Sequence, residues 1–87
     1  MNHIETKFIS ATDTRGERIK ATTTADRKTW IIKPYNYKLD VEENHRAVAR
    51  ELFDKLGWKK EDSKAYIRAT NRGYIYTFHY NWNVVDF

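Results

Sequence analysis

The stretch DVEENHRAVARELFDKLGW, from Asp40 to Trp58, predicts the one helix around which the rest of the chain is organised. Its apolar residues recur at spacings of three, four and seven, so they form one stripe along a helix. Asp40 is expected at the N-cap, and Glu43 three positions later completes a variant of the capping box. We therefore expect an amphipathic helix over residues 41–56. Its apolar stripe consists of Val41, Val48, Ala49, Leu52, Phe53 and Leu56.

The end of this helix is expected to form a Schellman motif. Gly57 can adopt the left-handed conformation at C′, and Trp58 follows it in position to pack back on Phe53. His45 flanks the apolar stripe and is expected to be a half-buried packing residue rather than a ligand. The opposite face carries charges of both signs, which is typical of a face in contact with solvent. Its residues are Glu43, Arg46, Arg50, Glu51, Asp54 and Lys55.

Three short strands are expected before the helix. The first covers residues 6–10, and the loop after it has Gly16 at a position of positive φ. Apolar and polar side chains alternate along residues 17–24, as they do in a half-buried strand. They form a hairpin with residues 28–33, which Pro34 ends because proline has no N–H to donate. The alternation places Ile19, Ala21 and Thr23 on one face and Arg18, Lys20 and Thr22 on the other.

Two strands are expected after the helix, at residues 65–70 and 74–82, in a hairpin with Gly73 in the left-handed conformation. The second strand has an aromatic residue at every second position. The location of this row depends on the register of the hairpin, because a slip of one residue exchanges the two faces. The row consists of Tyr74, Tyr76, Phe78, Tyr80 and Trp82.

The sequence is compatible with two registers of this hairpin. If Thr70 pairs with Ile75, Tyr76 and Phe78 lie in the core opposite the small side chains of residues 65–70. A slip of one residue instead places them on a face with Tyr66 and Arg68, as a platform on which single-stranded nucleic acid can stack. We favour the core register, because small alanine side chains opposite large aromatic rings pack well.

The chain of 87 residues is expected to form a single domain over residues 1–87. Its expected class is α+β: one antiparallel sheet of about five strands, in the order β-β-β-α-β-β, with the helix packed on one face. The chain has no cysteine, so disulfides and thiolate metal sites are excluded. Because no apolar stretch is long enough for a membrane span and Met1–Lys7 is polar, we expect neither a membrane segment nor a secretory signal, and a cytoplasmic location.

No motif in the sequence indicates catalysis. The three glycines are isolated, so they cannot form a phosphate-binding loop, and no serine lies in a GxSxG context. The three histidines lack the spacing of a metal site, and His3 is expected in a frayed terminus. A chain this short also has difficulty in enclosing a pocket of about 300 to 1,000 Å³. We therefore expect a protein without catalytic, cofactor-binding or metal-binding residues, which is not an enzyme.

The net charge of +4 favours association with acidic surfaces. In the favoured register, the sheet face away from the helix gathers basic and aromatic residues that could meet phosphates or an acidic protein. These candidate partner-binding residues are Arg18, Lys20, Tyr66, Arg68 and His79. We give equal weight to the alternative that this is an ordinary solvated sheet face without a binding role. The apolar tail is a second candidate surface, which either folds back on the sheet or docks on a partner. That partner could be a second copy of the chain, so the sequence is compatible with a monomer and with a homodimer. The apolar residues of the tail are Trp82, Val84, Val85 and Phe87.

Two stretches of the chain, KFISATDTRGERIKATT at residues 7–23 and ENHRAVARELFDKLGW at residues 43–58, resemble a widespread set of short uncharacterised proteins encoded by bacteriophages and mobile elements. The shared pattern is KFI, a Thr-rich turn, G-x-R-I-K-A, then N-H, an alanine-rich helix and K-L-G-W. The match covers a little over a third of the chain, carries no known catalytic residue, and does not include the aromatic C-terminal hairpin or the NVVDF tail.

The resemblance implies a non-catalytic accessory protein that binds and inhibits host machinery, such as a CRISPR effector or another defence complex. The expected partner is then a host protein or a ribonucleoprotein complex. The alternative is a small basic protein that binds single-stranded DNA or RNA directly.

Overall fold

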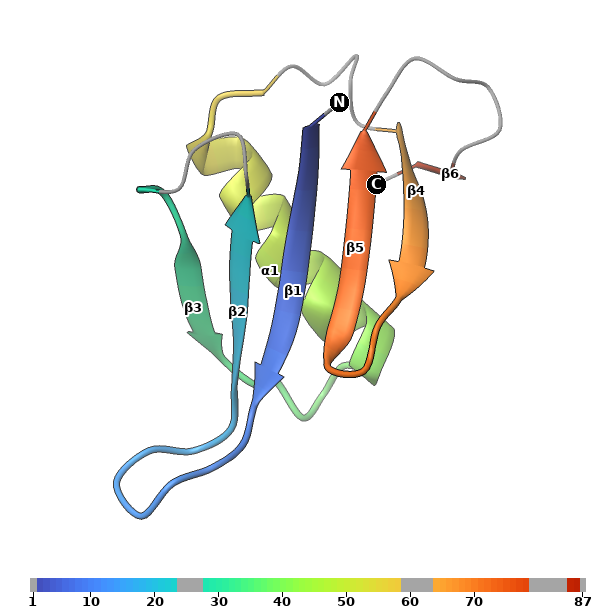
Figure 1. Ribbon diagram of the computed structural model, residues 1–87. Helices are drawn as coiled ribbons and strands as arrows, with labels where there is room; N and C mark the ends of the chain where they lie inside the picture. Colours follow the sequence, from blue (N-terminus) through green and yellow to red (C-terminus); the bar gives the residue numbers. More distant parts are fainter. Residues whose placement is uncertain (1, 24–27, 59–63, 79–84, 87) are drawn as a thin grey trace.

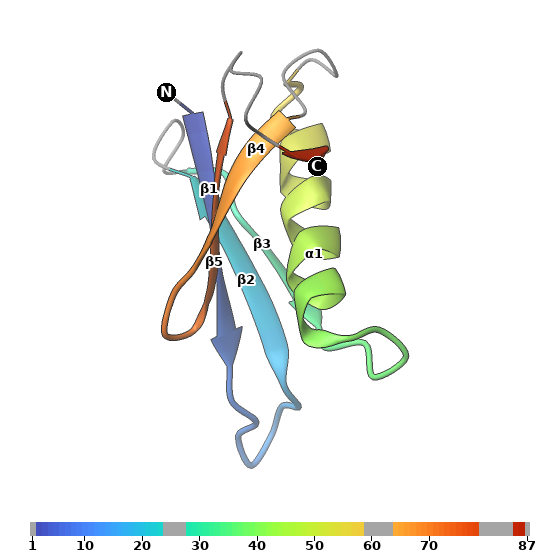
Figure 2. The same cartoon turned by 90° about the vertical axis from the view of Figure 1, so that its right-hand side faces the viewer.

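A computed structural model of the chain describes residues 2–23, 28–58, 64–78 and 85–86. Strands β1 (Asn2–Ile9), β2 (Arg18–Thr23) and β3 (Ile31–Pro34) precede the helix α1 (Val41–Lys55), and β4 (Lys64–Ala69), β5 (Gly73–Phe78) and β6 (Val85–Asp86) follow it. The strands form one antiparallel sheet in the order β3-β2-β1-β5-β4-β6 (Figure 1). Helix α1 lies on one face of this sheet (Figure 2). The predicted α+β class, with one helix packed on one face, is confirmed.

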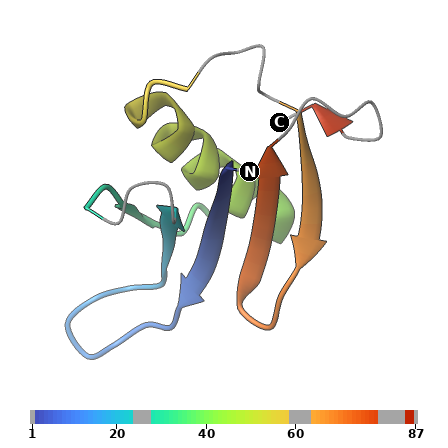
Figure 3. The same ribbon diagram turned by 45° about the horizontal axis from the view of Figure 1, so that its top comes forward.

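β1 is longer than predicted and lies inside the sheet rather than in a frayed terminus. It pairs with β2 along one edge and with β5 along the other, so that His3 lies opposite Thr77. The predicted strand began at residue 6, whereas Ile4 already lies in the strand and is fully buried. The short β6 was not predicted and pairs with β4 at the other edge of the sheet (Figure 3). Residues 79–82 of the last predicted strand lie outside the described residues.

The core lies between α1 and the face of the sheet that α1 covers. The ring of Phe53, on the helix, lies 5.2 Å from that of Phe78 on β5 and 5.6 Å from that of Trp58. The buried apolar residues are Ile4, Ile19, Ala21, Val48, Ala49, Leu52, Phe53, Ala65, Tyr76 and Phe78. The aromatic residues Tyr76 and Phe78 are therefore core residues, as the favoured register predicted.

The exact pairing in the β4–β5 hairpin differs from the prediction. The Thr70 N–H donates to the carbonyl of Gly73 at 2.8 Å, so residues 71–72 form a two-residue loop. Thr70 was expected opposite Ile75. Because the difference is two residues, every side chain keeps its predicted face. The observed pairs are Ala65 with Phe78, Ile67 with Tyr76, and Ala69 with Tyr74.

The predicted roles of two glycines were wrong. Among the described residues only Gly57 has positive φ, so neither Gly16 nor Gly73 adopts the left-handed conformation. Gly73 is required for a different reason, because a Cβ atom there would lie 2.1 Å from the carbonyl oxygen of Thr6 and 2.9 Å from Cε1 of His45. Close approach of backbones, rather than turn geometry, explains a glycine at this position.

Both ends of α1 have the predicted caps. Asp40 accepts a hydrogen bond from the Glu43 N–H at 2.8 Å. At the other end Gly57 has φ of +72°, and the Trp58 N–H donates to the Phe53 carbonyl at 3.4 Å, as in a Schellman motif. These local contacts hold the helix ends independently of the sheet.

The buried stripe of α1 differs from the predicted one at its first turn. Val41 is 56% exposed, whereas Asn44 and His45 are buried. The Asn44 side chain accepts a hydrogen bond from the Asn36 N–H at 2.8 Å and donates to three carbonyl groups in the segment before the helix. A polar side chain can be buried here because its hydrogen-bonding groups are satisfied.

Candidate functional site

The open face of the sheet, turned toward the viewer in Figure 1, carries most of the residues predicted to bind a partner. In β2 buried and half-buried residues alternate as expected, with Ile19 and Ala21 under the helix and Arg18 and Lys20 on the open face. On β4, Tyr66 and Arg68 are exposed, and Tyr66 lies opposite Thr77 of β5. The structure thus places four of the five predicted residues on this face, while His79 lies outside the described residues.

The predicted cations do not form one cluster, because β2 and β4 are not neighbours. β1 and β5 lie between them. With strands spaced by about 4.8 Å, Arg18 and Lys20 are roughly 14 Å from Arg68 across the sheet. Tyr66 lies on β4 with Arg68, at the far side of the face from Arg18 and Lys20. The order of the strands depends on long-range pairing, which the local pattern of the sequence does not reveal.

Lys7 of β1 joins Arg18 and Lys20 and was missed by the sequence analysis. It lies directly opposite Lys20, and Arg18 lies opposite Ile9 on the same pair of strands. We call Lys7, Arg18 and Lys20 the basic cluster. Like charges directly opposite each other on neighbouring strands destabilise a sheet.

No carboxylate within the part of the chain that the structure describes forms an ion pair with the basic cluster or with Arg68. The ion pairs of the described residues, Lys33 with Glu51 at 3.4 Å and Arg46 with Glu42 at 3.5 Å, both involve the helix. Nε of Arg18 is buried and has no hydrogen-bond partner among the described residues. Ion pairs between described residues therefore do not neutralise the positive charge of the open face.

An aromatic side chain borders the basic cluster. The ammonium group of Lys20 lies 5.0 Å from the ring centroid of Trp30, within the range of a cation–π interaction. Trp30 is 48% exposed and Tyr66, on the far side of the face, is 41% exposed. Between them Glu5 lies opposite Thr22 on one side and Ile75 on the other. The open face thus has basic and aromatic residues toward both sides and an acidic residue in its middle.

The C-terminal tail is described only in part. Val85 and Asp86 pair their backbones with Ala65 and Lys64 through β6, so this part of the tail adds to the edge of the sheet. Trp82, Val84 and Phe87 lie outside the described residues.

Within residues 2–23, 28–58, 64–78 and 85–86, no three histidine, aspartate or glutamate side chains are grouped so that they could hold a metal ion. No helix in those segments has the length and apolar character needed to cross a membrane.

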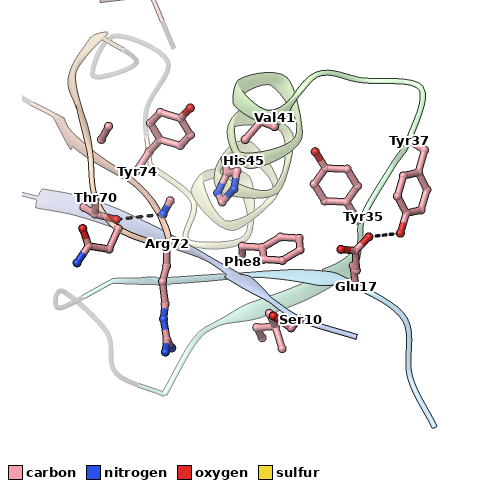
Figure 4. Close-up of a pocket in the computed structure, with 14 residues that line it drawn as sticks. Phe8, Ser10, Glu17, Tyr35, Tyr37, Val41, His45, Thr70, Arg72 and Tyr74 are labelled. Atoms are coloured by element: carbon pink, nitrogen blue, oxygen red, sulfur yellow. Dashed lines mark hydrogen bonds between the residues drawn. The ribbon is translucent and has the colours of Figure 1, made fainter. Parts of the chain in front are cut away.

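A groove of about 830 Å³ lies where α1 begins, between the end of β1 and the β4–β5 turn (Figure 4). Its aromatic lining comes from Phe8, Tyr35, Tyr37 and Tyr74. The Tyr37 hydroxyl donates to the Glu17 carboxylate, and this hydrogen bond raises the pKa of Tyr37. The groove was not predicted from the sequence, because its walls come from segments far apart in the chain.

His45 lies at the inner side of this groove and is more deeply buried than predicted. It is 2% exposed, and its Nδ1 lies 2.7 Å from Oγ1 of Thr6 on β1. Thr6 Oγ1 also accepts a hydrogen bond from the Tyr74 N–H at 3.2 Å. Burial lowers the pKa of His45 because it penalises the charged imidazolium. His45 therefore connects the helix to both central strands through Thr6.

A comparison with models of protein families, with curated proteins and with solved structures finds no match to this chain. What the open face and the groove can do chemically follows from their own residues.

Proposed function

We propose that this chain is a non-catalytic protein that docks on a host protein or ribonucleoprotein through the open face of its sheet and thereby inhibits it. The observation that carries the proposal is the basic cluster, in which Lys7 and Lys20 lie directly opposite each other without an ion pair to any residue that the structure describes. Such a pair costs stability in the free protein, and an acidic partner offsets that cost on binding.

The state of Arg18 supports docking by an acidic group. Its side chain is half-buried, and its Nε lacks a hydrogen-bond partner among the described residues. A carboxylate or phosphate can accept two parallel hydrogen bonds from a guanidinium group, which gives both affinity and orientation. A positioned arginine beside two lysines is therefore suited to an anionic group on a partner.

A protein surface fits the rest of the face better than a continuous nucleic-acid strand does. Trp30 and Tyr66 are exposed near its two sides, and tryptophan, tyrosine and arginine are enriched among the residues that dominate protein interfaces. Glu5 lies in the middle and repels a phosphate backbone that crosses the face. The resemblance to phage and mobile-element proteins adds the expectation that the partner is a CRISPR effector or another defence complex in the host cytoplasm.

Capture from a bacterial lysate tests this proposal. The full-length protein is immobilised as wild type, as Arg18→Glu/Arg68→Glu, and as the control Arg50→Glu/Lys55→Glu, which makes the same charge change on the exposed side of α1. We expect wild type and control to retain the same host protein, with and without nuclease, and the open-face variant to lose it. Equal retention by all three proteins contradicts docking through the open face.

Direct binding of single-stranded DNA or RNA is the second candidate function. It is favoured by the exposed pair of Tyr66 and Arg68 on β4, since bases stack on aromatic rings and arginine contacts phosphates. Fluorescence anisotropy with a labelled single strand distinguishes the two candidates. For a direct binder, the logarithm of the association constant falls linearly with the logarithm of the salt concentration, whereas a protein-directed inhibitor does not require affinity for the free strand.

A further inference from the structure

The groove at the start of α1 has the size of a ligand site. Its volume of about 830 Å³ lies within the range of about 300 to 1,000 Å³ that is usual for small-molecule sites. It lies at the end of the sheet, and the basic cluster projects from the open face, so the two surfaces can be changed separately.

Aromatic rings form two walls of the groove. Phe8 and Tyr35 contact each other edge to face, with ring centroids 5.8 Å apart at an angle of 86°. Tyr74 lies on the other side, and Figure 4 shows the imidazole of His45 between these two walls. Aromatic walls of this kind suit a planar ring, which stacks on them irrespective of its substituents.

His45 offers a hydrogen bond at the inner end of the groove. Its Nδ1 is occupied by Thr6, and no hydrogen bond joins its Nε2 to any described residue. Nε2 is not one of the buried atoms that lack a hydrogen bond, so solvent reaches it although the residue as a whole is only 2% exposed, and it is available to a ligand in the groove. When Nδ1 donates to Thr6, Nε2 can accept a hydrogen bond, and when Nδ1 accepts from Thr6, Nε2 carries the proton and can donate one.

Arg72 supplies a positive charge at the edge of the groove, where its side chain extends away from Tyr74 and His45 (Figure 4). It occupies the two-residue turn between β4 and β5, its side chain is exposed, and it forms no ion pair within the described residues. Its carbonyl accepts a hydrogen bond from the Phe8 N–H at 2.7 Å, which fixes the turn against β1. The same turn lies close to the basic cluster, since Lys7 is opposite Gly73.

We propose that this groove binds a nucleotide, with the base between the aromatic walls and hydrogen-bonded to Nε2 of His45, and the phosphate on Arg72. Base edges carry both donors and acceptors, so a base can serve either tautomer of His45. An aliphatic side chain or an acyl chain leaves Nε2 without a partner and makes no use of Arg72. The nucleotide is either free or an unpaired nucleotide of a single strand whose backbone continues toward Lys7.

A titration followed by NMR tests the proposal on the full chain. The probes are AMP, CMP, adenosine, inorganic phosphate and a short single-stranded oligonucleotide. The readouts are the backbone amides of Phe8, Thr70 and Gly73 and the imidazole nitrogens of His45. We expect saturable shifts of these signals with AMP or CMP, or with the oligonucleotide if a strand is the source. Adenosine is expected to bind about tenfold more weakly than AMP, because it lacks the charge-assisted contact to Arg72.

Variants with matched controls locate the binding. Val41→Trp fills the groove from an exposed position at the start of α1, and Ala47→Trp adds the same ring at an exposed position outside the groove. Val41→Trp should abolish binding and Ala47→Trp should not. Arg72→Ala should lower AMP affinity to that of adenosine, whereas Arg50→Ala should leave it unchanged.

Three results overturn the proposal: no shift with any nucleotide or oligonucleotide, the same shifts with inorganic phosphate alone as with AMP, or unchanged affinity in Val41→Trp. The Arg18→Glu/Arg68→Glu variant separates this site from the proposed docking face. It should bind AMP like wild type even where it fails to retain a host protein, so each proposal can fail without the other.

Discussion

The covered and the open face of the sheet are built from the same strands, yet different forces determine their residues. In β2 the buried Ile19 and Ala21 alternate with Arg18 and Lys20 on the open face, only one residue away. Packing under α1 restricts the size and shape of the first pair, whereas the second pair forms no ion pair in the described part of the chain, and Lys20 contacts only the exposed ring of Trp30 through its charge. Substitutions on the covered face should therefore change stability, and those on the open face should change binding.

The largest effect is expected on the covered face at Phe78. Phe78→Ala removes a ring that contacts Phe53 and Trp58, which should lower the free energy of unfolding by about 3 to 5 kcal/mol. Tyr66→Ala, on the open face two strands from the basic cluster, should change it by no more than about 0.5 kcal/mol. Denaturant melts of the two variants measure this difference. The reverse order would show that the aromatic row is an exposed platform.

A similar loss is expected at the centre of the helix stripe. Leu52 is fully buried, so Leu52→Ala should cost about 2 to 5 kcal/mol through the lost burial and the cavity that remains. Arg50→Ala, on the exposed side of the same helix, is the control and should be nearly neutral. A negligible shift of the denaturation midpoint for Leu52→Ala would place the core elsewhere.

A smaller loss is expected at Gly73, where β5 and β1 approach closely. Gly73→Ala introduces a Cβ atom 2.1 Å from the Thr6 oxygen, so the strands must move apart at a cost of about 1 to 3 kcal/mol. Gly16→Ala is the matched control, because a Cβ there has no atom within 4 Å. Thermal melts that show equal effects at the two glycines would contradict the close approach.

Acid should weaken the covered face through His45. Burial lowers the pKa of His45 below its ordinary value, so below about pH 6.5 the unfolded chain binds a proton that the native protein does not. The free energy of unfolding is therefore unaffected by His45 above that pH. Below it, stability should fall by up to about 1.4 kcal/mol for each pH unit until His45 titrates in the native state.

Urea melts between pH 7.5 and pH 5 measure this slope, and His45→Gln should reduce it. Titration of the His45 imidazole by NMR gives the native pKa directly. A pKa above the ordinary histidine value would mean that the buried imidazole is charged, and the same pH slope in the variant would mean that a group other than His45 causes the slope.

The smallest effect on stability is expected for the open face. Arg18→Glu/Arg68→Glu should change the free energy of unfolding by no more than about 0.5 kcal/mol, since neither residue forms an ion pair in the described structure. Association with the host protein retained by wild type should nevertheless slow, because such charges mainly steer encounter. Stopped-flow mixing at low and at physiological salt measures the rate. A large loss of stability would show that these cations hold the fold instead.

The features predicted correctly from the sequence depend on residues that are close together in the chain. The caps of α1 require only residues within one or two turns, and the alternation in β2 requires only neighbours along the strand. The faces of Tyr76 and Phe78 were predicted correctly because the alanines of β4 have the same spacing as the aromatic residues of β5, so that small side chains lie on the same face as large ones.

The features that were missed depend on residues distant in the sequence. Lys7 joins Lys20 only because β1 pairs with β2, and Arg68 is separated from them because β5 enters the sheet between β1 and β4. His45 can be buried because Thr6 provides a partner for its ring. The groove needs β1, β5, α1 and the segment before α1 together, and no local pattern indicates that they meet.

Photo-crosslinking from each face tests the central claim, that the open face is the docking surface, most directly. Benzoylphenylalanine replaces Tyr66 or Thr22 on the open face and Arg50 or Lys55 on the exposed side of α1, and each protein is irradiated in a bacterial lysate. The account predicts a discrete adduct with a host protein from the two open-face positions and none from the helix. An adduct formed only from Arg50 or Lys55 would contradict it, because the partner would then dock on α1.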